Sequence, residues 1–394
     1  MIYKEFKNLK LPRLGYGCMR LPEDEKTGKI DFTKAEELFD YSMANGLNYF
    51  DTAFFYHAGE SENVIGRALA KYPRETWYLA DKFPGNFVEY KDGKLYMDVT
   101  AMGMEKRTYN TVQEIFEHQL KHSGVEYFDF YMLHNVTEST YDLYTNDELG
   151  IVEYLVKERE AGRIKHLGFS SHGRYETIDK FLAKYDCFEY VMIQLNYLDW
   201  TLQEAGKKYD VITKHNLPVF VMEPLRGGLL SAPGVDAEAL LNATKPGKTP
   251  TSWSFRFIQS LPNVYVTISG MSTMEQLKEN IETYTTDEVM SDVEKKVLAQ
   301  VVDGMAKFVP CTSCRYCCGI CPQKLDIPML IATYNEADNS DSWYVNDLVS
   351  TLTDEEKPQA CIACGVCNPL CPQNIDIPEI LTKLVKLLEK SKEE

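Results

Sequence analysis

An alternation of short apolar runs with longer amphipathic segments across residues 1–290 constrains the fold of this 394-residue chain more than any other feature. Gly46, Gly124 and Gly162 stand where the helices between the runs should end. Eight strands that alternate with helices predict an α/β fold, a (β/α)8 TIM barrel. The runs that we expect to form its strands are 14–19, 48–51, 77–82, 128–134, 164–170, 191–195, 218–222 and 264–268.

An open doubly wound sheet would also alternate strands with helices. The sequence has no G-x-G-x-x-G after the first expected strand, which disfavours that arrangement. In a TIM barrel the chemistry lies where the strands end. The expected strands end in polar residues, namely Asp51, Lys82, His134, Ser170, Gln194, Glu223 and Ser269. Alternatively, Asp51 and Lys82 could form a buried ion pair that only holds the barrel mouth together.

Two cysteine runs follow the expected barrel, "CTSCRYCCGICP" at 311–322 and "CIACGVCNPLCP" at 361–372. Both have the spacing C-x2-C-x2-C-x3-C-P, and similar segments, "PQKLDIP" and "PQNIDIP", continue the repeat. In two-cluster iron–sulfur proteins three cysteines of such a run hold one cluster and the fourth binds the other. We predict two [4Fe–4S] clusters, one held by Cys311, Cys314, Cys317 and Cys371, the other by Cys361, Cys364, Cys367 and Cys321. Cys318, whose counterpart is Asn368, is expected to be a packed thiol.

The segment between the two runs has helical spacing and few hairpin signals, and the chain closes on an amphipathic stretch at 377–390. This pattern favours a mainly α-helical dicluster ferredoxin-like domain over the compact β-hairpin ferredoxin. We therefore expect two domains, a barrel at 1–290 and the cluster domain at 291–394.

The net charge of −17 argues against nucleic-acid binding, which requires broad neutralisation of phosphates. No apolar run reaches the roughly 20 residues of a membrane span, and the N-terminal segment lacks the apolar core of a secretory signal. These features predict a soluble, cytoplasmic protein. The acidic C-terminal part would suit a basic, ferredoxin-like or other redox partner.

The segment "GLNYFDTAFFYHAGESENVIGRAL" at 46–69 resembles the signature of the aldo–keto reductases. "DFYMLH", "RIKHLGFSSH", "QLNYLDW" and "ISGMSTMEQLKENI" follow it in that family's order. The resemblance covers residues 1 to about 290, and the cysteine-rich tail is similar to that of a bacterial subgroup of the family. It implies an oxidoreductase that acts on CH-OH or C=O groups with NAD(P), with Asp51, Tyr56, Lys82 and His134 as its catalytic residues.

The chemistry of carbonyl reduction fits those four residues, because it needs a hydride and a proton for the developing alkoxide. A tyrosine with a pKa of about 10 is a poor acid at neutral pH. A nearby ammonium lowers that pKa, and a carboxylate can hold the ammonium in place. We expect Tyr56 to donate the proton, Lys82 to tune it, Asp51 to orient Lys82, and His134 to hydrogen-bond the carbonyl oxygen.

The resemblance also implies an extended NADP or NAD molecule across the barrel mouth. Its pyrophosphate would lie along the segment 224–228, and the first amides of the "STMEQLKEN" helix would suit a phosphate. The residues expected to contact it are Ser170, Gln194, Leu225, Gly227, Ser269, Gly270, Ser272, Gln276 and Asn280.

Three residues depart from the family's pattern. Met222 stands where many members place an aromatic residue that stacks on the nicotinamide, and Ser171 replaces a common asparagine. Ser272 stands where an arginine often pairs with the 2′-phosphate, so the choice between NADP and NAD stays open. Lys278 could replace that arginine only as a point charge.

The segment 83–110 directly follows Lys82 and is longer than most barrel loops, so we expect it to be a flexible loop that shapes access to the substrate. A plain surface excursion is the alternative. The pocket would be lined by Phe54, Phe55, Tyr90, Tyr96 and Tyr141.

Hydride transfer moves two electrons together, whereas each cluster moves one, so their presence on one chain needs an explanation. Clusters and barrel could exchange electrons through a flavin or a substrate radical, although no flavin motif is legible. The clusters could instead only stabilise the tail. In a third hypothesis the barrel is idle and the chain is an electron-transfer or docking subunit, which leaves the four catalytic-type residues unexplained. We expect an oxygen-sensitive enzyme of an anaerobic prokaryote.

Overall fold

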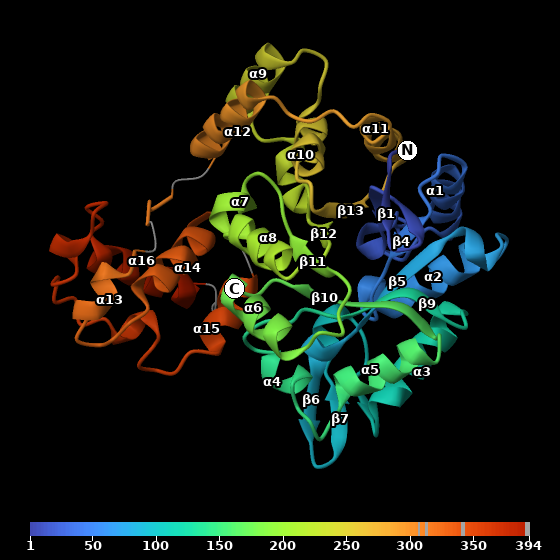
Figure 1. Ribbon diagram of the computed structural model, residues 1–394, viewed down its shortest axis with the longest axis horizontal. Helices are drawn as coiled ribbons and strands as arrows, with labels where there is room; N and C mark the ends of the chain where they lie inside the picture. The colour runs from blue at the N-terminus through green and yellow to red at the C-terminus, as the bar shows by residue number, and fades with distance from the viewer. Residues whose placement is uncertain (306–307, 312–313, 340–342, 391–394) are drawn as a thin grey trace. The chain divides into compact units, whose positions relative to one another are not determined.

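The computed structural model describes residues 1–305, 308–311, 314–339 and 343–390 (Figure 1). The chain divides into two compact units. The first comprises Met1–Tyr197 and Ala205–Lys295, and the second comprises Leu198–Glu204 and Lys296–Glu394. The expected domain boundary between residues 290 and 291 stays a prediction. No helix in the described part of the chain is both long enough and apolar enough to cross a membrane.

The first unit is a closed barrel of eight parallel strands in the order β10-β11-β12-β13-β3-β4-β5-β9. Each strand overlaps one of the predicted apolar runs, so the predicted TIM barrel is confirmed. The strands are β3 (Leu14–Gly17), β4 (Tyr49–Asp51), β5 (Tyr78–Phe83), β9 (Phe128–Leu133), β10 (Ile164–Ser171), β11 (Val191–Gln194), β12 (Val219–Met222) and β13 (Val264–Gly270).

Helices alternate with these strands along the chain and surround the barrel (Figure 1). Several begin at a polar N-cap, as where Thr111 accepts a hydrogen bond from the amide of Glu114. Gly124, with a φ of 66°, ends the third helix as expected. The main helices of this unit are α1 (Phe32–Ala44), α2 (Glu60–Leu69), α3 (Val112–Ser123), α5 (Ile151–Glu160), α6 (Tyr175–Lys184), α8 (Ala205–Lys214), α9 (Val235–Thr244), α10 (Pro250–Gln259) and α11 (Met274–Thr283).

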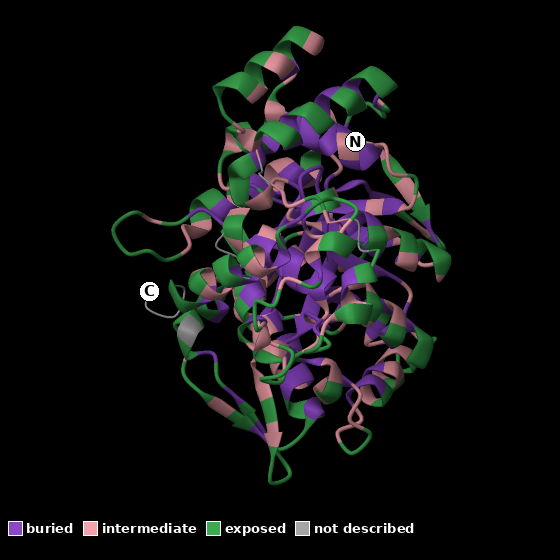
Figure 2. Cartoon of the chain, turned by 90° about the vertical axis from the view of Figure 1, so that its left-hand side faces the viewer, coloured by how far each residue is buried: buried purple, intermediate pink, exposed green. Residues whose placement is uncertain are grey.

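An N-terminal hairpin of β1 (Tyr3–Phe6) and β2 (Leu9–Pro12) packs on the core inside the barrel. The ring of Phe6 lies 5.7 Å from that of Phe130 and 6.0 Å from that of Phe220. Buried residues concentrate in this interior (Figure 2). The interior is thus filled with side chains, and polar chemistry is left to the strand ends. The sequence did not predict this hairpin.

The segment after β5 is a three-stranded antiparallel sheet, so the prediction of a flexible loop was wrong. Its strands are β6 (Val88–Lys91), β7 (Lys94–Met97) and β8 (Arg107–Tyr109). Asp92 and Gly93 both have positive φ in the two-residue turn between β6 and β7, which is the geometry that favours Asp-Gly in hairpins. Leu95 and Met97 of β7 are buried, so one face of this sheet is covered.

The second unit is helical, and its described residues contain no strand. Its apolar core includes Leu330, Leu348 and Leu384, together with Cys317 and Cys367. Within this unit Gln203 Nε2 donates a hydrogen bond to Glu336 Oε1 at 2.9 Å. The helices are α7 (Asp199–Leu202), α13 (Tyr316–Ile320), α14 (Ile327–Asn339), α15 (Trp343–Ser350) and α16 (Ile377–Lys390), and α12 (Asp292–Met305) crosses the boundary between the units. The expected helical architecture of the tail is confirmed.

The contact between α2 and α3 provides a test of the barrel's packing. A methyl group on Gly66 of α2 would lie 1.9 Å from the carbonyl oxygen of Ser123. We expect Gly66→Ala to lower the free energy of unfolding by about 1–3 kcal/mol, because backbone must move. Urea unfolding followed by circular dichroism measures the change. Gly304 is a helical glycine with open space around it, so Gly304→Ala should cause no loss of stability. Equal losses in both variants would contradict the close contact between α2 and Ser123.

Candidate active site and metal centres

A buried ion pair joins the ends of two neighbouring strands. Asp51 ends β4 and Lys82 lies near the end of β5, which pairs with β4. Lys82 Nζ lies 2.6 Å from Asp51 Oδ1 and donates to the carbonyl oxygen of Thr52 at 2.5 Å. Lys82 is only 1% exposed and Asp51 only 3%. Burial alone would lower the pKa of Lys82, but Asp51, Tyr56 and Asp81 together outweigh it and the pKa is raised, so Lys82 is charged.

Tyr56, which begins a short helical turn after β4, lies over this ammonium. Lys82 Nζ is 4.9 Å from the centre of its ring. Burial raises the pKa of Tyr56 and the charge of Lys82 lowers it, with a net rise. The Lys82 ammonium therefore lowers the pKa of Tyr56, as predicted. The expected net lowering of that pKa was wrong, because the effect of burial is larger. Tyr56 is only half-buried, and its phenol keeps its proton at neutral pH.

His134 follows β9 directly and completes the group. Its ring stacks on Phe55 at 5.0 Å and meets Tyr56 edge-on at 6.3 Å. Burial and the charge of Lys82 lower its pKa well below the ordinary value, so the imidazole is neutral. Among the described residues its buried Nδ1 has no hydrogen-bond partner. The ends of β4, β5 and β9 thus bring the four predicted catalytic residues together.

The aromatic residues expected around the substrate are only partly where the sequence placed them. Phe55 lies against His134, and Phe87 meets Phe55 at 4.6 Å. Phe87 was not predicted from the sequence as part of this aromatic group. Its position in the segment that directly follows Lys82 could have indicated it. Of the other expected residues, Phe54 packs on His118, Tyr90 donates to Glu148, Tyr96 is exposed and Tyr141 packs on Phe181.

Several expected cofactor contacts make hydrogen bonds within the protein instead. Ser170 Oγ accepts from the amide of Asn135 at 2.9 Å, which holds the chain just after His134. Asn280 Nδ2 donates to Ser269 Oγ at 3.3 Å and ties α11 to β13. Gln194 is also buried. Ser269 and Asn280 therefore support the fold directly.

The N-terminus of α11, expected to receive a phosphate, is largely satisfied by its own side chains. Gln276 Oε1 accepts from the amide of Ser272 at 2.8 Å and from that of Thr273 at 3.3 Å. Thr273 Oγ1 accepts in turn from the amide of Gln276. Lys278, the alternative point charge, lies over the ring of Tyr41. Of the residues expected to contact the cofactor, Gly227, Gly270 and Gln276 are exposed, and Leu225 and Ser272 are partly exposed.

A buried acid pair that the sequence did not reveal lies behind Lys82. Asp81 Oδ1 accepts from the amide of Lys82 at 2.8 Å. Gln119 Nε2 donates both to Glu62 Oε1 and to the carbonyl oxygen of Lys82, each at 3.0 Å. Burial raises the pKa of Glu62 to about 7 and that of Asp81 well above its ordinary value. Asp81 and Gln119 thus hold the backbone of Lys82 in place. In the sequence the group is visible only as polar residues on otherwise apolar faces.

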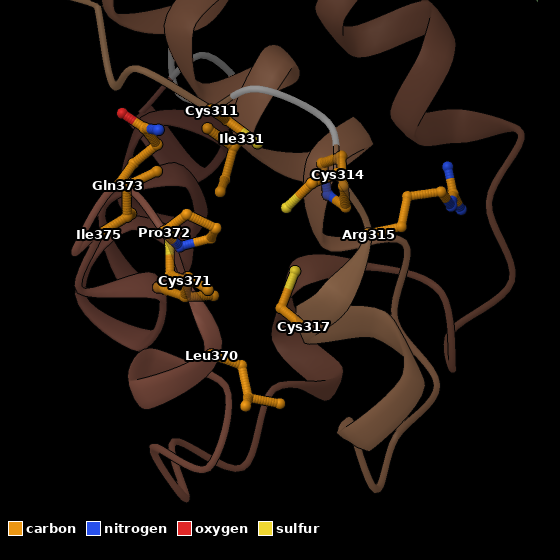
Figure 3. A pocket seen from close by; sticks show the side chains of 12 residues that line it. Cys311, Cys314, Arg315, Cys317, Ile331, Leu370, Cys371, Pro372, Gln373 and Ile375 are labelled. Atoms are coloured by element: carbon orange, nitrogen blue, oxygen red, sulfur yellow. The ribbon is translucent and has the colours of Figure 1, made fainter.

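The eight predicted cluster cysteines form two groups of four. One cavity of the second unit is lined by Cys311, Cys314, Cys317 and Cys371 (Figure 3). The other is lined by Cys321, Cys361, Cys364 and Cys367. Their volumes are nearly equal, about 320 Å³ and 330 Å³. Each cavity therefore takes three cysteines from one run and the fourth from the other.

The backbone repeats along with the cysteines. Arg315 and Gly365, at equivalent positions, have φ values of 63° and 72°, and the pair Lys324 and Asn374 have 55° and 52°. Burial raises the pKa of Cys317 to about 12, so this thiol would ionise only beside a cation. In the described part of the chain no three potential ligands group closely enough for a single metal ion. Four thiols around one apolar-walled cavity fit a larger cluster instead.

Comparison with known families decides the kind of protein. Residues 13–298 match the aldo/keto reductase family. This chain is an aldo–keto reductase. Residues 310–375 of this oxidoreductase match the 4Fe-4S dicluster domain, so the predicted family and the iron–sulfur nature of the tail are confirmed.

The relatives of this aldo–keto reductase are distant. The uncharacterized oxidoreductase YqkF of Bacillus subtilis is 26% identical over 297 residues, which cover 70% of this chain and 88% of that protein. The holo form of aldo-keto reductase AKR11C1 from Bacillus halodurans superposes with a TM-score of 0.59 and 24% identity over 76% of this chain and 96% of that one. An aldo-keto reductase from Klebsiella pneumoniae, solved in complex with NADPH, superposes with a TM-score of 0.57 and 18% identity. The match covers 77% of this chain and 96% of that one. These structures share the barrel fold.

The acid pair predicts a pH dependence of stability. Glu62 holds its proton up to about pH 7 in the folded chain but only to about 4.5 when unfolded. Stability is therefore lost as pH rises through that window, by about 2–3 kcal/mol. Glu62→Gln should flatten this fall in urea unfolding measured from pH 5 to 8. Glu60→Gln, which changes an exposed neighbour on α2, should not flatten it. An unchanged slope in Glu62→Gln would exclude Glu62 as the source of the pH dependence.

Proposed function

We propose that this aldo–keto reductase reversibly reduces a small-molecule carbonyl with NADPH or NADH, using Tyr56 as proton donor. The observation that carries the proposal is the convergence of Tyr56 and His134 on the buried pair of Lys82 and Asp51, whose charged atoms lie 2.6 Å apart. The NADPH bound by the Klebsiella pneumoniae relative supports the choice of cofactor class. A nicotinamide supplies the hydride when bound.

The four side chains divide the remaining work. Tyr56 gives its hydroxyl proton to the oxygen of the substrate as negative charge develops there. Lys82 stabilises the phenolate that Tyr56 becomes, which offsets the burial that raises the pKa of Tyr56. Asp51 holds the Lys82 ammonium in place. In the reverse direction the phenolate of Tyr56 accepts the proton of the alcohol.

His134 positions the carbonyl. Its imidazole is neutral, because Lys82 and burial both lower its pKa, so it donates one hydrogen bond and adds no charge. Phe55 covers one face of the ring, and Phe87 packs on Phe55. This aromatic wall favours a substrate with an apolar group next to its carbonyl.

We further propose that the two cysteine-lined cavities each hold a [4Fe–4S] cluster with exchanged fourth ligands. Cys311, Cys314, Cys317 and Cys371 would hold one, and Cys361, Cys364, Cys367 and Cys321 the other. Bound clusters supply one-electron redox chemistry.

A structural role of the clusters is the second candidate, favoured by the place of Cys317 and Cys367 in the core of the helical unit. Iron would then link α13 and the segment around Cys371 as a metal stabilises other small domains. Electron exchange with a redox partner would add to this role without replacing it.

Replacing Tyr56 by Phe tests the catalytic assignment. The variant keeps the ring and loses only the hydroxyl group that donates the proton, so we expect turnover of carbonyl substrates to fall by about 10²–10⁴-fold with cofactor affinity unchanged. Anaerobic NADPH oxidation and calorimetric NADP⁺ binding measure the two quantities. Tyr90→Phe, whose hydroxyl donates to the exposed Glu148, is the matched control. Undiminished turnover in Tyr56→Phe would exclude Tyr56 as the donor.

Iron content tests the exchanged ligands. Wild-type protein should hold about eight iron atoms per chain. Cys311→Ser combined with Cys371→Ser removes two ligands of one cluster, so about four atoms should remain. Cys311→Ser combined with Cys321→Ser affects both clusters and should lower iron further. The reverse ranking would mean that each run holds its own cluster. Cys318 lines neither cavity, so Cys318→Ser should leave the iron content unchanged.

A further inference from the structure

The loops after β12 and β13, which the sequence predicts along the cofactor's phosphates, carry the carboxylates of Glu223 and Glu275 as well as the basic Arg226. Glu223 Oε2 accepts from the amide of Gly227 at 2.6 Å, and Glu275 lies in the first turn of α11. The amides at the start of α11 are largely occupied by Gln276 and Thr273. A further cation beside these loops would favour the binding of an anionic dinucleotide.

Arg20, just after β3, supplies such a cation from a third loop. Its Cβ, Cγ and Cδ lie 3.3–3.5 Å from where a methyl group on Gly270 would stand. Its Nη2 lies 3.7 Å from the corresponding position on Gly227, whose φ is 64°. The side chain therefore crosses the end of β13 and places its guanidinium beside the glycines that follow β12. At Gly270 the absence of a side chain makes room for the stem of Arg20, and at Gly227 it leaves room for a ligand next to the guanidinium.

Two side chains from different loops fix the backbone of this arginine. Ser272 Oγ donates to the carbonyl oxygen of Arg20 at 2.7 Å. His57 Nε2 accepts from the amide of Leu21 at 2.9 Å, and its Nδ1 lies 3.1 Å from Glu23. Ser272 stands where many relatives were expected to carry a phosphate-binding arginine; here it holds an arginine that comes from another element.

The guanidinium of Arg20 has no hydrogen bond or ion pair with any residue that the structure describes, and Arg20 is exposed. Glu223, the acidic group on the neighbouring loop, binds the amide of Gly227 instead. The five donors of Arg20 thus remain available, and a fork of this kind matches phosphate oxygens.

We propose that Arg20 binds the pyrophosphate of the nicotinamide dinucleotide and is a phosphate-binding cation of this enzyme. The inference rests on the proposed use of NADP or NAD. It assigns Arg20 to the phosphates that both dinucleotides share, because its guanidinium lies beside Gly227 and not at the start of α11. An arginine at the 2′-phosphate would instead discriminate between NADP and NAD.

Calorimetric titration of the intact, cluster-loaded protein with NADP⁺ and with NAD⁺ tests this assignment. Arg20→Ala should weaken both dinucleotides by the same factor, about 10–30-fold, and Arg20→Lys by less, because a point charge replaces a fork. The change should appear in the KM for the cofactor, with kcat at saturation retained. Arg67→Ala removes an exposed guanidinium from α2 and should leave both affinities unchanged.

Unchanged affinity in Arg20→Ala would overturn the proposal, and a loss confined to NADP⁺ would place Arg20 at the 2′-phosphate instead. Absence of binding of either dinucleotide to the wild-type protein would contradict the proposed cofactor use itself. Because Arg20 lies at the surface, its variants should retain the circular dichroism of the wild type. The salt dependence of NAD⁺ binding gives a second readout, since loss of a phosphate contact should lower its slope.

Discussion

The buried pair of Lys82 and Asp51 is the interaction on which the catalytic end of the barrel depends. Removing two charges from water costs several kcal/mol per ion, and attraction offsets this cost only with good geometry and further hydrogen bonds. The carbonyl oxygen of Thr52 supplies one such bond, and Asp81 and Gln119 hold the backbone of Lys82 from behind. Burial and the same ammonium together lower the pKa of His134. Protonation at the mouth therefore depends both on burial and on where this one lysine is fixed.

The second unit places ionisable groups in its interior in a different way. Its cysteines lie in or beside the apolar core of α14 and α16, where burial keeps the thiol of Cys317 protonated. The barrel balances a buried cation with a carboxylate already in the chain. In the helical unit the proposed clusters would supply the balancing charge, so folding and cluster binding are expected to be coupled there.

Much of the fold could be predicted because buried parallel strands are nearly continuous apolar runs, and Asp51, Lys82 and His134 stand at their ends. The cysteine spacing likewise indicated the grouping seen in the two cavities. What the sequence could not show depends on contacts between distant segments. Glu62 meets Gln119 across two helices, and no periodicity records that contact. The hairpin at Asp92 and Gly93 did carry a local signal, which the length of the segment obscured.

Arg20 shows why matching a family position by position is insufficient for this site. The family's arginine position holds Ser272, which by itself suggests a weaker phosphate site. In three dimensions Ser272 and Gly270 are the surfaces along which Arg20 runs. Charge at a barrel mouth can come from any of the loops that meet there, since the strand ends lie side by side. What the phosphates require is positive charge nearby, whichever loop supplies it. An arginine that is missing from one loop can therefore be replaced by an arginine from another.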